Sequence, residues 1–385
     1  MRVLFATDEY PPFIRGGAGV YAYNITSRLC GKVEYDVVVP DKKKEHIRSE
    51  VPIDERVSVD RVGFIDLPGL RFPSSGYSIY RKYGKLADEY DIVHSSSGMG
   101  FMLSGRKLET VHHTMKAEMD FVSLNGGNSS TGMMNNLFYY KLRDRLERMS
   151  FKSSRHFIAM SEYTRRSLVE DYGIAESSIT VTNSGVDTER FKPRDRHDSR
   201  DRLGLSHDDK ILLFVGRLEE RKNLAALIKS MALLGGYKLL ICGGGPLENS
   251  MKSLAGRMGV KNVFFKGFVS EDMLPYYYNA ADLLVHTAEV EGFCLSLVEA
   301  LSSGIPVLAQ RKSGMRDILD KCGVVEELPD TSMDSILAGV RGIVEGGIAS
   351  ERLPSYVSRA RSEFNWDAIA GRTLEVYKKL ASDKI

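Results

Sequence analysis

The sequence predicts an α/β protein with two doubly wound parallel sheets, each in a domain of its own. The chain has 385 residues, more than one hydrophobic core usually supports. Short apolar runs alternate with helical patterns, and this alternation occurs in both halves of the chain. Between the halves, residues 191–208 (FKPRDRHDSRDRLGLSHD) are polar and lack apolar periodicity. We therefore predict an N-terminal domain over residues 1–190, a linker over 191–208 and a C-terminal domain over 209–365.

In the first half, seven runs have the length and composition of buried strands: Arg2–Asp8, Tyr35–Pro40, Val57–Phe64, Asp91–Ser95, Glu109–His113, His156–Ser161 and Ile179–Asn183. Apolar residues at helical spacing lie between them, for example over Gly19–Cys30 and Ser161–Tyr172. The stretch Ser123–Asn136 is rich in Gly, Ser and Asn. We expect a mobile loop there, which is either a lid over a ligand or an ordinary connection.

The second half contains six runs of the same kind: Lys210–Val215, Lys238–Cys242, Val263–Lys266, Asp282–His286, Pro306–Ala309 and Val324–Glu326. Because helical patterns separate these runs, a second parallel sheet follows.

The overall composition argues against several classes of protein. With 53 basic and 51 acidic residues, the formal net charge is +2, which is too small to indicate a nucleic-acid partner. The four cysteines show neither the spacing of a zinc site nor that of a disulfide framework. The first residues enter a strand directly, and no run approaches the roughly 18 apolar residues that cross a bilayer. We expect a cytoplasmic protein, soluble or peripheral.

The stretch from Glu291 to Ala309 (EGFCLSLVEALSSGIPVLA) is the most informative for function, because a predicted strand leads through a loop into a predicted helix. The helix N-terminus would present amide groups to an anion near Cys294 and Leu295. Glu299 could accept hydrogen bonds from ribose hydroxyls, and Glu291 from a second polyol. The alternative is that Glu291 complements the helix dipole and Glu299 is a solvated surface group. Apolar residues surround Glu299, so we expect a partner for it.

A second group of charges follows the strand KILLFV, where Arg217 and Lys222 lie within GRLEERKN. At the C-terminal edge of a parallel sheet, two cations could clamp a diphosphate. The neighbouring acidic residues Glu219 and Glu220 allow the competing interpretation of surface ion pairs, but Gly216 at the end of the strand favours the diphosphate clamp.

Glycines follow two further strands. Gly244 lies in ICGGGPL, and glycine lets the backbone approach a ligand closely. Gly16 and Gly17 follow the first strand, without the GxGxxG spacing of a dinucleotide site.

The chain resembles the retaining glycosyltransferases of family 4, which have the GT-B fold. The segments that carry the resemblance follow one another along nearly the whole chain: PPFIRGGAGVYAYNI, ETVHH, AMSEYTRRSL, TVTNSGVDTERFKP, FVGRLEERKN, ICGGGPL, VFFKGFVSEDMLPYYYNAADLLVHTA, EGFCLSLVEALSSGIPVLA and FNWDAIAGRTLEVYKKL. The resemblance implies two Rossmann-like domains facing across a cleft, with the C-terminal helix (366–385) completing the first domain.

The resemblance also implies roles for particular residues. Arg217 and Lys222 would hold the donor diphosphate, Glu299 the ribose and Glu291 the transferred sugar. His112 would reach that sugar from the first domain, although His113 is an alternative and a histidine at a strand end is often only structural. The implied catalytic set is His112, Arg217, Lys222 and Glu291. The implied donor-binding set is Gly16, Gly17, Arg217, Lys222, Gly244, Gly292, Phe293, Cys294, Leu295 and Glu299.

The chain departs from the family pattern at the presumed phosphate loop. Cys294 stands where glycine is usual, and Ser296 replaces a common proline. Downstream, Ser313, Gly314 and Asp317 take the place of a glycine pair and a glutamate. No Asp-x-Asp motif flanked by apolar residues is present, so we expect no metal and no cofactor.

The function implied is transfer of a hexosyl group from a GDP- or UDP-linked donor to a hydroxyl of a glycan, a lipid-linked acceptor or a small sugar. Two alternatives stay open: a nucleotide-sugar epimerase of the same fold, and an inactive nucleotide-sugar-binding protein. Peripheral contact with an anionic membrane is a further interpretation, based on Lys42, Lys43 and Lys44 and on the basic helical stretch Tyr139–Arg155. A basic solvated helix is the simpler account of that stretch.

Overall fold

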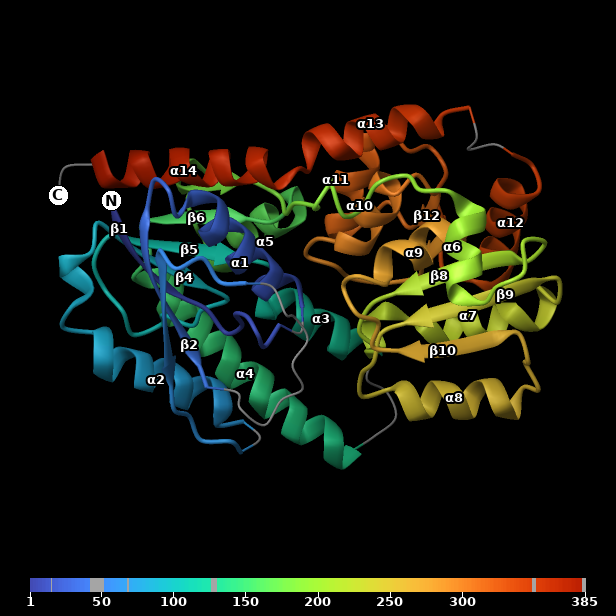
Figure 1. The fold of residues 1–385 in the computed structure, drawn as a ribbon. Coiled ribbons are helices and arrows are strands. Elements are labelled where there is room, and N and C mark those ends of the chain that lie inside the picture. The colour runs from blue at the N-terminus through green and yellow to red at the C-terminus, as the bar shows by residue number, and fades with distance from the viewer. Residues whose placement is uncertain (15, 42–51, 68, 126–129, 348–350, 383–385) are drawn as a thin grey trace. The chain divides into compact units, whose positions relative to one another are not determined.

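The computed structural model describes residues 1–14, 16–41, 52–67, 69–125, 130–347 and 351–382. The chain divides into two compact units, Met1–Ser184 with Trp366–Ile385, and Gly185–Asn365 (Figure 1). Each unit contains one parallel sheet with helices on both faces. The predicted fold class, two Rossmann-like α/β domains, is confirmed.

The sheet of the first unit has seven parallel strands in the order β3-β2-β1-β4-β5-β6-β7. They are β1 (Arg2–Ala6), β2 (Glu34–Pro40), β3 (Val57–Val62), β4 (Ile92–Ser96), β5 (Lys107–Val111), β6 (His156–Ala159) and β7 (Ile179–Val181). All seven match a predicted run within a few residues.

Within the described residues of this unit, six α-helices cover the sheet: α1 (Gly17–Leu29), α2 (Arg71–Tyr83), α3 (Met115–Asn125), α4 (Ser130–Lys152), α5 (Glu162–Tyr172) and α14 (Trp366–Ser382). Two 3₁₀ turns, η1 (Ala87–Glu89) and η2 (Glu176–Ser178), precede β4 and β7. Sequence chemistry explains the ends of α5. The Ser161 side chain accepts a hydrogen bond from the amide of Thr164, and Gly173 ends the helix with a left-handed φ of 68°.

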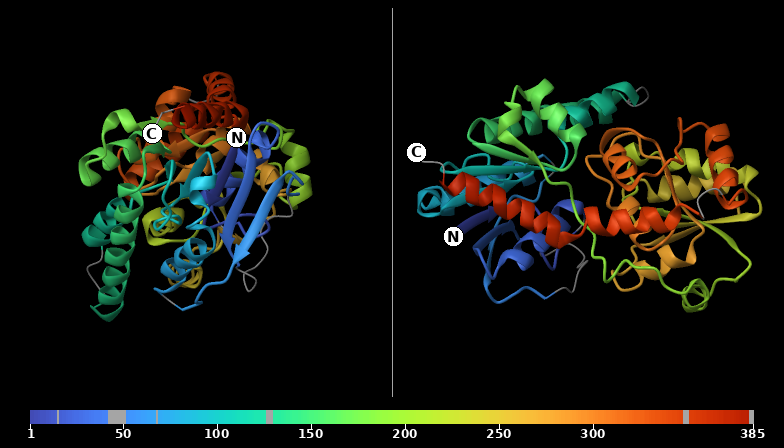
Figure 2. Two further views of the ribbon diagram at one scale, coloured as in Figure 1. Left: turned by 90° about the vertical axis from the view of Figure 1, so that its left-hand side faces the viewer. Right: turned by 90° about the horizontal axis from the view of Figure 1, so that it is seen from above.

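Helix α14 follows α13 in the chain, yet it packs against α1 in the first unit (Figure 2). Its Tyr377 is fully buried, and the hydroxyl lies 2.7 Å from Nδ1 of His94 on β4. Thr373 lies 3.3 Å from the hydroxyl of Tyr21 on α1. The last helix is therefore part of the core of the first unit.

The sheet of the second unit has five parallel strands in the order β10-β9-β8-β11-β12. They are β8 (Lys210–Val215), β9 (Tyr237–Cys242), β10 (Val263–Gly267), β11 (Leu283–His286) and β12 (Val307–Ala309). Along β8, Ile211 and Leu213 belong to the apolar cluster on one face, whereas Leu212 and Phe214 belong to the cluster on the other. A strand buried on both faces needs helices on both sides of the sheet.

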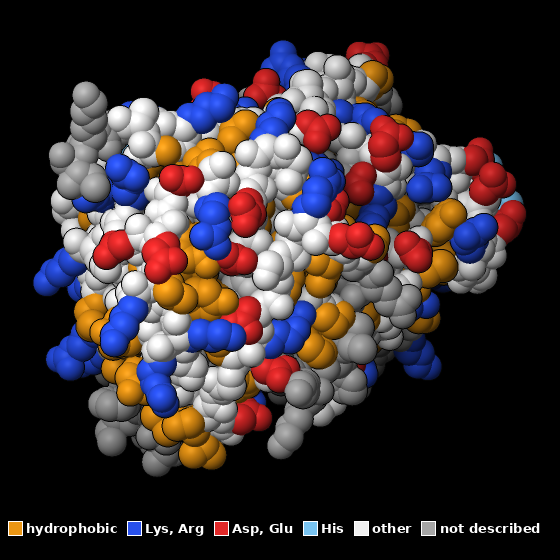
Figure 3. Space-filling view, turned by 60° about the vertical axis from the view of Figure 1, so that its left-hand side comes forward, with side chains coloured by type: hydrophobic (Ala, Val, Ile, Leu, Met, Phe, Trp, Pro, Cys, Tyr) orange, Lys and Arg blue, Asp and Glu red, His pale blue; other side chains and the backbone are white. Residues whose placement is uncertain are grey.

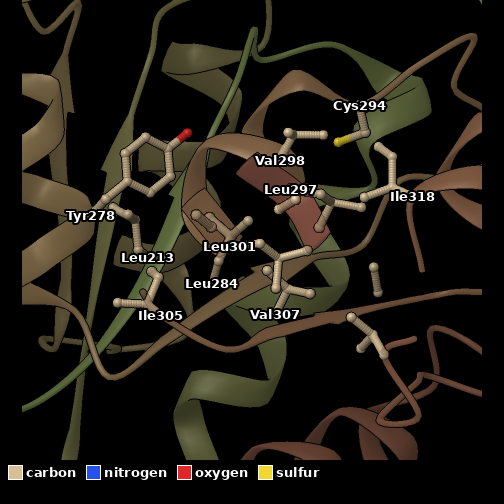
Figure 4. Close-up of a cluster of buried hydrophobic side chains, with 14 of the residues drawn as sticks. Leu213, Tyr278, Leu284, Cys294, Leu297, Val298, Leu301, Ile305, Val307 and Ile318 are labelled. Carbon is tan, nitrogen blue, oxygen red and sulfur yellow. The ribbon is translucent and has the colours of Figure 1, made fainter. Parts of the chain in front are cut away.

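In the part of this unit that the structure describes, eight α-helices surround the sheet: α6 (Arg196–Leu203), α7 (Leu224–Ser230), α8 (Glu248–Arg257), α9 (Leu274–Ala280), α10 (Leu295–Ser302), α11 (Ser313–Cys322), α12 (Met333–Val344) and α13 (Leu353–Glu363). Two 3₁₀ turns, η3 (Glu220–Lys222) and η4 (Met231–Leu233), flank α7. One core cluster gathers α9, α10, α11 and α13, and Figure 4 shows part of it around Leu297 and Leu301.

The structure differs from the prediction in the segment 191–208. Instead of a featureless linker, it contains α6 and belongs to the second unit. Asp195 caps the helix through a hydrogen bond from the amide of Asp198, and Gly204 ends it with a φ of 65°. Apolar periodicity is weak because Arg200 anchors this helix: its Nε donates to the carbonyl of Ala280 at 3.0 Å.

Two further predictions are wrong in part. Val324–Glu326 forms no strand: these residues pair with no strand of the sheet, and only an isolated bridge joins Leu328 to Gln310 nearby. The expected loop Ser123–Asn136 is helical at both ends, where α3 ends at Asn125 and α4 begins at Ser130. Residues 126–129 lie outside the described residues.

On the face shown in Figure 3, Lys and Arg side chains lie among Asp and Glu side chains, as the near balance of charges leads one to expect. Among the helices that the structure describes, none combines the length and the apolar composition that a membrane crossing requires.

Candidate functional site

The carboxyl ends of β8 and β11 mark the point at which the strand order of the second unit reverses. These two strands are neighbours, but the chain continues from β8 to β9 on one side and from β11 to β12 on the other. In open α/β sheets, the loops at such a point are the usual place for a ligand. The loop after β8 carries Arg217 and Lys222, and the loop after β11 carries Glu291.

Glu291 is buried among three basic side chains. Arg221 Nη1 donates to its Oε2 at 2.7 Å, His286 Nε2 lies 3.0 Å from Oε1, and Lys222 Nζ also contacts Oε1. Burial acts to raise the pKa of Glu291, but Lys222 and Arg221 outweigh it and hold that pKa well below its usual range. Glu291 is therefore an ionised group held by fixed partners, not a solvated surface charge.

Cys294 and His286 form a buried pair beside Glu291. The Cys294 sulfur lies 3.3 Å from Nε2 of His286 and 3.3 Å from Oγ of Ser296. Burial acts to lower the pKa of His286, but Cys294 and Glu291 raise it to about 9. Burial likewise acts to raise the pKa of the Cys294 thiol, but His286 lowers it. Cys294 and Ser296, the two departures from the family pattern within the presumed phosphate loop and the start of α10, thus contact each other.

Arg217 lies further from the buried charges, with a side chain that is 46% exposed. Its Nε is 2.8 Å from Oε1 of Glu219, and Glu219 Oε2 is also 3.2 Å from Nε of Arg221. A row of alternating charges therefore runs from Arg217 through Glu219 and Arg221 to Glu291. The pair with Glu219 is made through Nε, one of the five N–H donors of the guanidinium, and the role of Arg217 in binding a diphosphate stays a prediction.

Glu299 contacts helix α9. Its Oε2 accepts a hydrogen bond of 2.6 Å from the hydroxyl of Tyr278. Figure 4 shows this tyrosine hydroxyl pointing away from Leu213 and Ile305. Burial raises the pKa of Glu299 to about 7, although the hydrogen bond from Tyr278 acts to lower it. Tyr278 is the partner that the apolar surroundings of Glu299 led us to expect. Near neutral pH, this carboxyl group can accept or donate a hydrogen bond.

The loop Gly292–Leu295 leads into α10, with Cys294 in the N-cap position and no side-chain cap to the helix. Helix α11 is hydrogen-bonded to the start of this loop: the amide of Gly314 donates to the carbonyl of Glu291 at 2.8 Å. A Cβ atom on Gly314 would lie 2.0 Å from the carbonyl oxygen of Gly292, so a larger residue would displace the loop.

Two further residues of this unit that were predicted to bind the donor, Phe293 and Gly244, lie next to other groups of the same unit. Phe293 packs beside Phe364, with ring centroids 5.6 Å apart. A Cβ atom on Gly244 would have room, with Glu248 Oε2 nearest at 3.5 Å. The tight positions are its neighbours Gly243 and Gly245, where a Cβ atom would lie 2.0 and 2.6 Å from backbone atoms of the loop after β8. These two glycines let the loops after β8 and β9 pack together.

In the first unit, His112 follows β5 at the carboxyl edge of the sheet. Its Nε2 lies 3.1 Å from Oγ of Ser96, which ends β4, and its ring packs edge-on against Tyr21 of α1. Burial, with the nearby His113, lowers the pKa of His112 to about 3, so the imidazole is neutral at pH 7. His113 points elsewhere, toward Glu118 at 3.3 Å. Between the two histidines, His112 is the one packed at the sheet edge.

Gly16 and Gly17 lie at the same carboxyl edge, where the chain leaves β1 and enters α1. The amide of Gly16 donates to Oε2 of Glu9 at 3.0 Å, and a Cβ atom on Gly16 would meet nothing within 4 Å. The backbone here is therefore approachable.

Of the residues considered for membrane contact, Lys42, Lys43 and Lys44 lie outside the described residues. In α4, two cations make contacts within the unit: Arg143 lies 3.4 Å from the ring centroid of Phe72, and Arg148 pairs with Asp144 at 2.9 Å.

Sequence reasoning missed three side chains of the candidate site, namely Arg221, His286 and Tyr278. Arg221 lies in the same GRLEERKN motif as Lys222, so the motif itself was a signal for it. His286 is the last residue of an apolar strand, the position at which polar groups meet a ligand in parallel sheets. Tyr278 carried no signal beyond the need of Glu299 for a partner.

Comparison with known families covers both units. Residues 15–190 match the family described as Glycosyltransferase Family 4, and residues 195–358 match that described as Glycosyl transferases group 1. An uncharacterised glycosyltransferase of Methanocaldococcus jannaschii is 26% identical, with 98% of each chain covered. A D-inositol 3-phosphate glycosyltransferase of Kineococcus radiotolerans is also 26% identical, over 96% of this chain and 92% of the relative.

Solved structures share the fold of the whole chain. The sucrose-phosphate synthase of Thermosynechococcus elongatus superposes with a TM-score of 0.81 at 18% identity, covering 98% of both chains. HepE of Anabaena, in complex with UDP and glucose, superposes with a TM-score of 0.75 at 17% identity, covering 98% of this chain and 99% of that one.

Proposed function

Because this chain belongs to the family 4 glycosyltransferases of group 1, we propose that it moves a hexosyl group from a UDP- or GDP-linked donor to an acceptor hydroxyl, with retention of the anomeric configuration. One observation carries the proposal. Arg221 and Lys222 contact Glu291 just before α10, and Arg217 lies in the same loop after β8, at the point where the strand order of the second sheet reverses. Such a place suits a diphosphate.

The leaving group sets the chemistry. As the bond between the sugar and the diphosphate breaks, negative charge grows on the phosphate and positive character grows on the sugar ring. Arg217, Lys222 and the amides of Gly292–Leu295 stabilise the phosphate charge. We propose that the acceptor hydroxyl gives its proton to the leaving phosphate, and we assign no protein nucleophile. We also propose that the transfer needs no metal and no cofactor.

The carboxylates hold the sugars. Glu299, backed by Tyr278, accepts hydrogen bonds from the ribose hydroxyls of the donor. Glu291 accepts from hydroxyls of the transferred hexose while Lys222 turns a free N–H toward the phosphate. A lysine ammonium has three donors, so it can serve both groups.

The first unit supplies the acceptor side of the reaction. We assign Gly16 and Gly17 to donor binding; the backbone at Gly16 is open, because a Cβ atom there would meet nothing within 4 Å. His112, which is neutral at pH 7, offers a hydrogen bond to the transferred sugar without repelling the positive character of its ring. HepE shares the fold and was solved with UDP-glucose, which supports a UDP-linked hexose as the first donor to try.

The test begins with a panel of UDP- and GDP-linked hexoses, each scored for binding and then for nucleotide release with sugar, glycan, lipid-linked and polyol acceptors. D-inositol 3-phosphate belongs in the panel because relatives carry its name. We expect nucleotide release to depend on the acceptor, and NMR of the product to show the anomeric configuration of the donor. An epimerised nucleotide sugar formed without acceptor would show an isomerase instead, and binding without any turnover an inactive binding protein.

Two matched variants test the assignment of the carboxylates. Glu299→Gln should weaken nucleotide binding more than Glu291→Gln, because only Glu299 is assigned to the nucleotide. The variant Glu189→Gln is the control, since that side chain is 81% exposed. Equal and negligible effects of the first two variants would remove both residues from the donor site.

We also propose a cytoplasmic location with peripheral contact to anionic membranes through α4 and the lysines 42–44. The test is co-sedimentation with phosphatidylserine vesicles and with neutral vesicles. Equal binding to the two kinds of vesicle would rule the contact out.

A further inference from the structure

Three side chains that can bind a metal ion lie close together at the proposed phosphate loop. His286 Nε2, a carboxylate oxygen of Glu291 and Cys294 Sγ all lie within 4.8 Å of one another, and all three residues are buried. They come from the end of β11 and from the loop before α10, so the backbone that holds them is anchored in the sheet and in the core cluster of Figure 4.

The spacing of these atoms approaches that of a tetrahedral zinc site. With zinc bonds of about 2.0–2.2 Å to N and O and about 2.3 Å to S, the N···O and N···S separations would be roughly 3.4 and 3.6 Å. In the structure they are 3.0 Å between His286 and Glu291 and 3.3 Å between His286 and Cys294. These two separations differ from the zinc values by a few tenths of an ångström, and the Glu291 oxygen lies within 4.8 Å of the Cys294 sulfur.

We propose that His286, Glu291 and Cys294 form a site for a soft divalent cation, with Zn²⁺ as the ion that this ligand set suits. A thiolate and an imidazole select zinc over Mg²⁺ or Ca²⁺, which prefer oxygen ligands. Three protein ligands leave the fourth zinc position for water. None of the family features in the sequence requires this site, because glycine is usual at the position of Cys294.

The groups around the proposed site favour reversible binding of the metal ion. Lys222 and Arg221 now neutralise Glu291, so an incoming cation must displace the Lys222 ammonium from Oε1. Lys222 has a flexible stem and partial access to solvent, which allows it to move. Among the described residues, Nδ1 of His286 has no hydrogen-bond partner, although zinc-binding histidines are usually supported there. Both facts favour exchangeable zinc over a permanent structural ion.

The proposed site has a consequence for activity, which rests on the proposed function. Zinc on Glu291 removes the carboxylate from the transferred sugar and moves Lys222 from its place beside the phosphate. Zinc is therefore an inhibitor of sugar transfer, and a chelator restores the activity.

Binding is tested with Co²⁺ alone, on the full chain without donor or acceptor. A thiolate ligand to cobalt gives an intense near-ultraviolet charge-transfer band, and tetrahedral cobalt gives strong visible bands. We expect both signals at one cobalt per chain, and Zn²⁺ should abolish them by displacement. Cys294→Ala should lose the charge-transfer band, whereas Cys242→Ala, which removes another buried cysteine of the same unit, should keep it.

A second variant covers the case in which Cys294→Ala does not fold, as judged by circular dichroism. His286→Asn should weaken cobalt binding at least tenfold and remove the tetrahedral visible bands, while leaving the thiol in place. A wild-type protein without a charge-transfer band, or a band that survives in folded Cys294→Ala, would overturn the site. Cobalt binding in a protein that transfers no sugar would keep the site and reject the proposed function, and transfer that saturating Zn²⁺ does not slow would reject only the inhibition.

Discussion

Alanine replacements of Arg217 and Lys222 can distinguish a role in donor binding from a role in folding stability, because the two side chains differ in burial. The Lys222 side chain is 11% exposed and contacts the buried Glu291, whereas the Arg217 side chain is 46% exposed and pairs with Glu219. If both hold the donor diphosphate, both variants lose activity, but only one should lose stability.

The magnitudes follow from these contacts. Breaking a buried ion pair costs about 3–5 kcal/mol, and Arg221 and His286 remain on Glu291, so we expect about 3 kcal/mol for Lys222→Ala. An exposed pair contributes about 0–1 kcal/mol, so Arg217→Ala should leave stability almost unchanged. Removal of one preorganised donor to a developing anion costs about 3–4 kcal/mol, so each variant should lose at least a hundredfold in turnover.

The assay combines urea unfolding with the rate of nucleotide release at saturating donor. Arg316→Ala is the control, since this arginine of α11 is 55% exposed and pairs with Asp320. It should change neither quantity. Arg217→Ala with wild-type turnover and wild-type donor affinity would refute the diphosphate clamp, and a loss below about 1 kcal/mol in Lys222→Ala would refute the buried-pair reasoning.

Three further outcomes are expected. The pKa of Glu299 rises from 4.5 to about 7 on folding, so the folded state binds a proton more tightly and stability falls as pH rises through this range. In urea unfolding at pH 5 and pH 8, Glu299→Gln should remove up to about 3 kcal/mol of this pH dependence. An unchanged pH dependence of the free energy of unfolding would contradict the assignment. Gly314→Ala should lower the free energy of unfolding by about 1–3 kcal/mol, because its Cβ atom would clash with Gly292. Gly371→Ala, where α14 leaves open space for a Cβ atom, should raise the free energy of unfolding by about 0.5–1 kcal/mol. Similar effects of the two variants would argue against the close approach of Gly314 to Gly292. Donor turnover should persist in EDTA, and a loss that Mg²⁺ restores would disprove metal-independent transfer.

The strands could be predicted from sequence because parallel strands buried on both faces are continuous apolar runs. All seven strands of the first sheet and all five of the second fall on predicted runs. Helix α6 could not be predicted from periodicity, because Arg200 and its hydrogen bonds anchor it in place of an apolar face. Its capping residues, Asp195 and Gly204, were the available signal.

The charged residues that directly follow a strand could be predicted from the sequence. The side chains that they contact from distant segments of the chain could not. Lys222 and Glu291 were singled out separately, but nothing in the sequence shows that they contact each other across 69 positions. The same holds for Tyr278 and Glu299, which lie on different helices. Long-range pairing depends on the packing of the sheet and its helices, which a linear pattern does not encode.

The position of α14 affects the order in which the protein can fold during synthesis. The ribosome completes β1 to β7 first, but the hydroxyl of Tyr377 that meets His94 is made only after the whole second unit. Until then, the surface of α1 that α14 covers stays open to water or to chaperones. The core of the first unit therefore cannot be complete until α14 has been made, and we expect a truncation before Trp366 to destabilise the first unit more than the second.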